Sequence, residues 1–89
     1  MLRQKVTIRN KLGLHARAAA KLVNTAGRFE SRVVLVNRDK RADGKSIMGI
    51  MMLAAAQGTE LELGVDGADE EHALEAVVSL FDDLFGEAE

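Results

Sequence analysis

Two stretches of alternating side chains constrain the fold more than any other feature of this sequence. Residues 2–8 carry apolar side chains at positions 2, 6 and 8, with charged or polar residues between them. In residues 60–66, Leu61, Leu63 and Val65 alternate with acidic residues and a glycine. Successive side chains of a strand point to opposite faces, so both stretches predict strands with one buried and one solvent-exposed face. A sheet of such strands needs cover on one side only.

Helical patterns lie between and after these strands. Residues 16–26 are rich in alanine and leucine and place Ala19, Leu22, Val23 and Ala26 on one face. Gly27 is placed to cap the end of this helix. An apolar run at 47–56 predicts a short second helix.

Asp69 stands at the N-cap position of a third predicted helix, whose first turn is acidic, as the helix dipole prefers. One apolar stripe runs along this helix at helical spacing. Its members are Leu74, Val77, Val78, Phe81, Leu84 and Phe85.

Two further strands complete the expected fold. Residues 32–37 are β-branched and apolar, and residues 38–44 read as a turn with a short third strand. The order is therefore β-α-β-β-α-β-α, which predicts an α+β fold with an antiparallel sheet covered by helices on one face. With 89 residues, short connections and no linker, we expect a single domain over 1–89.

Composition excludes several classes of protein. Cysteine is absent, so disulfides and thiolate metal sites are excluded, and the core must be aliphatic. No apolar run approaches the roughly 20 residues that span a bilayer, and the first ten residues do not form a signal-type apolar stretch. We expect a cytoplasmic protein that does not bind membranes.

Charge is distributed unevenly along the chain. The net charge is −2, but every lysine and arginine lies at or before Lys45. The N-terminal half is therefore expected to face acidic partners or phosphate. Only three aromatic residues are present, all phenylalanine, so nucleic acid is not an expected partner.

Few residues could carry chemistry. No short metal-ligand spacing joins the two histidines, His15 and His72, so no metal site is expected. His72 stands among Glu70, Glu71 and Glu75 and is interpreted as a surface side chain. No glycine-rich phosphate loop or nucleophile with a plausible base is present, so neither a cofactor nor catalysis by this chain is expected.

His15 occupies a different setting, where the loop of residues 10–13 gives way to the first helix. The free N–H groups of residues 16–18 lie next to it and would hold an attached anion. A neutral imidazole is a competent nucleophile toward phosphorus. A phosphoryl group on the ring would lie within reach of the Arg17 guanidinium. From position alone, an exposed histidine that merely precedes a helix remains the alternative.

The short helix predicted after residue 46 has two apolar faces. We interpret Ile47, Met48 and Met51 as a docking surface, because methionine suits a surface that must fit several partners. Ordinary packing is the alternative. The face assigned to the core is Ile50, Leu53 and Ala54.

Two segments carry a resemblance to a known family. GLHARAA at 13–19 and GKSIMG at 44–49 resemble the HPr family, the histidine phosphocarriers of the bacterial phosphotransferase system. The resemblance implies an open-faced β-sandwich with a four-stranded sheet. It implies that His15 receives phosphate from Enzyme I, itself charged by phosphoenolpyruvate, and donates it to IIA domains, with Arg17 stabilising the group. It also implies that HPr kinase/phosphorylase phosphorylates Ser46, and we expect a monomer.

One residue departs from the family pattern: proline is usual at the position of Ala18. Alanine is the best helix former, so the helix should survive. The rigidity of the His15 loop and the efficiency of transfer are the properties that this departure affects.

Two other classes of protein are alternatives to a carrier. A regulatory domain of the same fold would bind proteins in a Ser46-dependent manner, and the pairing of His15 with Arg17 argues against it. An acyl carrier with a prosthetic group on serine would be all-helical, which the alternating strands exclude. Sugar uptake, a nitrogen-related branch and a purely regulatory cascade differ in partners, and the transfer site does not distinguish them.

Overall fold

Seven regular elements and a final 3-10 turn form along the chain in the predicted order. The computed structural model describes residues 1–89. The predicted β-α-β-β-α-β-α succession is confirmed. The elements are β1 (Leu2–Thr7), α1 (Ala16–Ala26), β2 (Arg32–Asn37), β3 (Lys40–Asp43), α2 (Ile47–Met52), β4 (Glu60–Asp66), α3 (Glu70–Asp82) and the 3-10 turn η1 (Leu84–Gly86).

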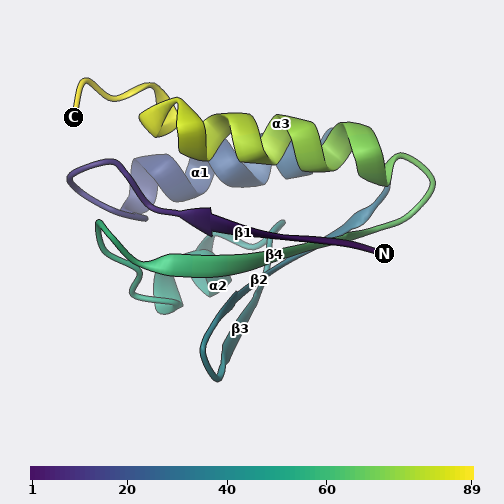
Figure 1. Ribbon diagram of the computed structural model, residues 1–89, viewed down its shortest axis with the longest axis horizontal. Coiled ribbons are helices and arrows are strands. Elements are labelled where there is room, and N and C mark those ends of the chain that lie inside the picture. Colours follow the sequence, from purple (N-terminus) through teal and green to yellow (C-terminus); the bar gives the residue numbers. More distant parts are fainter.

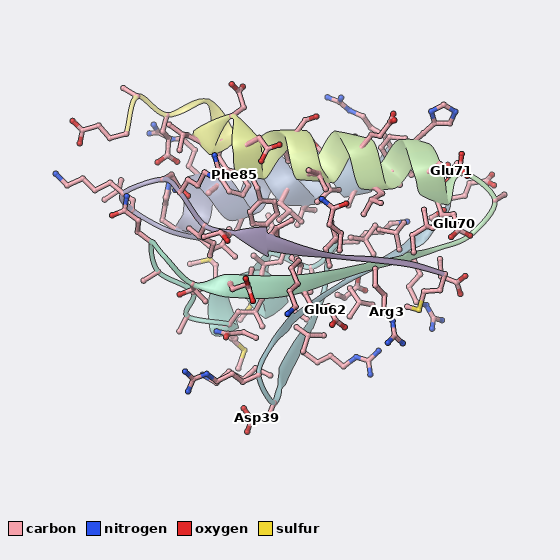
Figure 2. The ribbon with its side chains drawn as sticks, in the orientation of Figure 1. Arg3, Asp39, Glu62, Glu70, Glu71 and Phe85 are labelled. Atoms are coloured by element: carbon pink, nitrogen blue, oxygen red, sulfur yellow. The ribbon has the colours of Figure 1, made fainter.

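All four strands join one antiparallel sheet in the order β1-β4-β2-β3. Helices α1 and α3 lie side by side on one face of this sheet, and α2 contacts both α1 and β3 (Figure 1). On the other face Arg3 and Glu62 point away from the helices (Figure 2). The expected open-faced sandwich is thus confirmed. No helix has the length and apolar character needed to cross a bilayer.

The core lies between the sheet and the helices. Leu61, Leu63 and Val65 of β4 are buried, whereas Glu60 and Glu62 are exposed, as the alternation predicts. Burying each large aliphatic side chain contributes about 1.5–3 kcal/mol. The largest fully buried side chains are Phe81, Phe85, Ile8, Leu22, Leu35, Ile50, Leu53, Leu61, Leu63, Val33, Val65 and Val77.

Gly27 is the C-cap residue of α1, as predicted, and it donates its N–H to the Val23 carbonyl with a right-handed φ of −66°. The end of α2 differs from the prediction. Ala54, assigned to the core from the sequence, is exposed and has a φ of +51°. The chain turns sharply there, and the turn carries Ala55 into the core in its place. Alanine adopts this conformation less readily than glycine, which is why the pattern did not predict the turn.

Part of the apolar stripe predicted for the third helix lies beyond the end of α3. The helix ends at Asp82, and Leu84 and Phe85 follow with φ of 56° and 54°. Phe85 is nevertheless buried, and its ring meets that of Phe81 edge-on with 5.0 Å between centroids. Within the predicted stripe, Leu74, Val78 and Leu84 are only half-buried, and the unpredicted Ala73 is buried.

Asp69 precedes α3 as predicted, but its side chain makes no hydrogen bond to its own helix. Its carboxylate instead accepts hydrogen bonds from the Glu30 N–H at 2.9 Å and from the Ser31 N–H and hydroxyl at 2.9 and 2.5 Å. These hydrogen bonds lower the pKa of Asp69, and the bond from the Ser31 hydroxyl has the largest effect. The residue thus joins the start of α3 to the segment that leads into β2.

Replacing Asp69 with asparagine should lower the melting temperature at neutral pH, because the charge-assisted bonds to residues 30 and 31 are lost. A carboxyl group whose pKa is lower in the folded state than in the unfolded state stabilises the protein when the pH is above its unfolded-state pKa. This stabilisation is lost as the pH falls through the folded-state pKa. The difference between wild type and variant should therefore shrink below about pH 4. Thermal melts across this range test it, and a pH-independent difference would contradict this account.

Candidate functional site

His15 is the N-cap residue of α1. Its backbone is extended, with φ −72° and ψ 178°, and its imidazole Nδ1 accepts a hydrogen bond from the backbone N–H of Arg17 at 3.2 Å. Nδ1 therefore faces the N-terminus of an 11-residue helix, where unpaired N–H groups and the helix dipole favour negative charge. Because Nδ1 accepts this hydrogen bond, it carries no proton. Its lone pair becomes free when the Arg17 N–H moves away.

The loop before His15 is held in place by its own hydrogen bonds. The Asn10 side-chain amide donates to the Gly13 carbonyl at 2.7 Å, and the Leu14 N–H donates to the Ala55 carbonyl at 3.0 Å. Gly13 has a φ of +67°, and a Cβ there would lie 2.5 Å from the Ala55 carbonyl oxygen. Only glycine fits this close approach. These contacts hold the loop in place, although the chain has alanine at position 18, where proline is usual.

The other ring nitrogen of His15 has a partner that sequence reasoning missed. Nε2 lies 2.5 Å from Oε2 of Glu87, while the Asn10 amide donates to Oε1 of the same carboxylate at 3.2 Å. The hydrogen bond with His15 is the main cause that lowers the pKa of Glu87, and burial opposes it. Glu87 lies beyond α3, 72 residues from His15, and no local pattern signals the contact.

Basic side chains surround the same place. A hollow of about 870 Å³ is lined by His15, Arg17, Lys11, Lys21 and Glu87 among its residues. Arg17 is exposed in the first turn of α1, whereas the Lys21 ammonium donates to the Phe85 carbonyl at 2.5 Å. His15 and Arg17 therefore line one hollow, together with two lysine side chains that favour an incoming anion and with the carboxylates of Glu87 and Glu89.

Ser46 is the N-cap residue of α2, and its hydroxyl accepts a hydrogen bond from the Gly49 N–H at 3.1 Å. Ile47, Met48 and Met51 are 41, 73 and 45% exposed. Met52, which lies outside the predicted docking surface, is 72% exposed. We call these four apolar side chains of α2 the methionine patch.

The patch and His15 lie on neighbouring elements. Helix α2 packs against α1, and the segment after α2 accepts the hydrogen bond from Leu14, the residue before His15. The patch and His15 are therefore carried by helices that contact each other.

His72 does not join this site. It is exposed near the start of α3 and follows Glu70 and Glu71 in the chain. Figure 2 shows these two glutamates at the end of α3 opposite to Phe85. No three histidine, aspartate or glutamate side chains gather as metal ligands would.

Comparison with known proteins agrees with this geometry. A family model described as the phosphorylation site of the phosphotransferase system HPr component matches residues 2–83. Phosphocarrier protein HPr of Neisseria meningitidis serogroup A is 55% identical over the full length of both chains. The crystal structure of HPr from Thermoanaerobacter tengcongensis superposes with a TM-score of 0.96, 44% identity and full coverage of both chains. Bacillus subtilis Crh, a catabolite repression protein, superposes with a TM-score of 0.76 and 45% identity over 94% of this chain and 97% of its own.

These matches span the loop and helix that carry His15, and with them both segments on which the resemblance rested. The chain belongs to the HPr family of histidine phosphocarrier proteins.

Proposed function

We propose that His15 accepts the phosphoryl group on Nδ1 and donates it from there to acceptor proteins. The observation that carries this proposal is the position of Nδ1 at the N-terminus of α1, against the Arg17 N–H. When Nδ1 bonds to phosphorus, that N–H loses its imidazole partner and becomes free to bind a phosphoryl oxygen. The helix dipole and the Arg17 guanidinium add favourable charge.

Within the phosphotransferase system, Enzyme I is the donor that we propose and IIA domains are the acceptors. The chain itself acts as a stoichiometric carrier in the cytoplasm, so the partners supply catalysis, metal and substrate. Exposed methionines in the patch suit successive docking of different partners, because their flexible side chains adapt to different surfaces. A carrier that releases each partner needs a small interface of modest affinity.

We also propose that the working form is a monomer. The related Crh forms a dimer in which a segment is swapped. Sedimentation at the concentrations used for phosphorylation distinguishes the two forms for this chain.

Incubation with Enzyme I and phosphoenolpyruvate tests the carrier function directly. Intact-mass measurement should show the gain of one phosphoryl group, and brief acid treatment should remove it, because phosphohistidine is acid-labile. A regulatory domain of the same fold that carries no phosphate would show no gain. Adding a IIA domain to the phosphorylated protein should return the mass to its starting value.

Arg17→Ala should slow phosphoryl transfer more than it lowers stability. A charge-assisted contact to the transferred group is worth about 1.5–3 kcal/mol, or roughly 10- to 150-fold in rate, whereas exposed residues contribute about 0.5 kcal/mol to folding. Arg17→Lys should rescue only part of the rate, because an ammonium lacks the planar fork. Stopped-flow transfer rates and melting temperatures measure both effects. Normal transfer with reduced stability would contradict this role.

A further inference from the structure

The His15–Glu87 contact at Nε2 is not needed to attract an anion, because it puts negative charge beside a site that must bind phosphate. Its geometry points to another use. We propose that Glu87 is a positioning residue for phosphoryl transfer, which holds the imidazole proton on Nε2 and thereby leaves the Nδ1 lone pair as the nucleophile. This inference rests on the proposed role of His15 as acceptor.

Several contacts hold the tail that carries Glu87 in place. Leu84, Phe85 and Gly86 have φ of 56°, 54° and 75°, so three successive left-handed residues turn the chain back after α3. Phe85 is buried, and its carbonyl accepts the hydrogen bond from Lys21. The tail and the loop before α1 lie at the same end of the molecule (Figure 1).

The last residue completes this arrangement. The Glu89 carbonyl accepts a hydrogen bond from the Lys11 N–H at 2.9 Å, so both ends of the tail are bonded to the body of the protein. A left-handed conformation is costly for leucine and phenylalanine, and it persists only where surrounding contacts determine it. The return of Glu87 to His15 is therefore a built feature of the fold.

The two ring nitrogens indicate one tautomer. Nδ1 faces the Arg17 N–H, a donor, and must be the unprotonated nitrogen. Nε2 faces the Glu87 carboxylate, whose pKa is lowered. This carboxylate is therefore ionised at neutral pH and accepts a hydrogen bond from the Nε2 N–H. The Asn10 amide, which donates to the second carboxylate oxygen, orients Glu87, whose side chain is only 16% exposed.

This arrangement supports transfer in both directions. On acceptance, the Nδ1 lone pair forms the N–P bond, and the bond from phosphorus to the donor breaks with its electron pair leaving on the donor. The Nε2 proton stays in place, so the ring gains positive charge, which the Glu87 carboxylate stabilises. On donation the N–P electron pair returns to Nδ1, and the ring leaves as a neutral imidazole. A carboxylate that orients and stabilises a reacting histidine has a precedent in the Ser-His-Asp triad.

Two substitutions at Glu87 test the proposal, and Glu75→Gln is the matched control. Glu75 carries the same charge, but it is exposed on α3 and lies outside the hollow that His15 lines. Glu87→Gln keeps the size and removes the charge, whereas Glu87→Ala also uncovers Nε2. We expect both Glu87 variants to lower kcat for phosphorylation by Enzyme I about 10- to 100-fold with little change in KM. Glu75→Gln should match wild type.

A second measurement separates positioning from a merely structural role. Each protein is phosphorylated with phosphoramidate, a small donor that needs no docking, and the modified nitrogen is identified by 31P and 15N NMR. Wild type and Glu75→Gln should carry phosphate on Nδ1 alone, and Glu87→Ala should also carry it on Nε2.

A wild-type kcat in both Glu87 variants, with Nδ1 as the only site in Glu87→Ala, would overturn the proposal. A lower melting temperature without either change would leave Glu87 a structural residue and would overturn it equally. Failure of the wild type to take phosphate from Enzyme I would instead remove the proposed function itself.

Discussion

Replacing His15 with alanine is expected to abolish phosphate acceptance from Enzyme I while the protein remains folded. The acceptor atom is removed, and no other histidine lies near the site. The His15 side chain is 26% exposed and is not one of the buried core residues, but it caps α1 through Nδ1. Losing a cap costs about 1 kcal/mol, so a modest fall in melting temperature should accompany complete loss of acceptance.

His72→Ala is the matched control for this experiment. It removes the same side chain from an exposed position near the start of α3 and should accept phosphate at the wild-type rate. Intact-mass measurement after incubation with Enzyme I and phosphoenolpyruvate reads both variants. Acceptance by the His15 variant together with its loss in the His72 variant would show that the site is assigned to the wrong histidine.

Ser46→Asp is expected to raise the KM for Enzyme I about a hundredfold or more while the fold stays stable. The Ser46 side chain caps α2 and is followed directly by the exposed Ile47 and Met48 of the methionine patch. Negative charge at this point must be desolvated when a partner covers the patch, and an unpaired or like charge in an interface costs several kcal/mol. Aspartate is itself a good N-cap, so thermal stability should remain close to that of wild type.

The interpretation of Ser46 as a cap alone makes a different prediction. Aspartate would then be neutral in both assays, and Ser46→Ala would lower stability by about 1 kcal/mol with a normal KM. Enzyme I kinetics and melting temperatures measured on both variants separate the two interpretations. A wild-type KM in the aspartate variant would rule out regulation through docking. Phosphoserine carries nearly two charges and should weaken docking further than aspartate.

Local patterns predicted most elements of the fold correctly. The bounds of α1, β2 and β4 agree with those predicted from periodicity, because each element buries one side of a regular repeat. The position of His15 before α1 and the exposure of Met48 and Met51 on α2 followed from the same kind of local information. These features depend on residues within one or two turns of each other.

The errors share a different origin. Ala54, Leu84 and Phe85 adopt left-handed conformations that their residue types do not signal, because tertiary contacts compensate for the cost. Asp69 occupies a cap position, yet its carboxylate bonds to residues 30 and 31 across the fold. A carboxylate takes the strongest donors that the folded chain brings to it, and a sequence pattern cannot show which these are.

The same distinction holds at the site. The sequence alone singled out His15 as the expected acceptor and predicted that it precedes the first helix, since both follow from neighbours in the chain. Only the tertiary structure decided that Glu87 meets Nε2, because three left-handed residues and the bond from Lys21 turn the tail back onto the loop before α1. A contact between residues 72 positions apart depends on how the helices pack, and packing is a property of the whole fold.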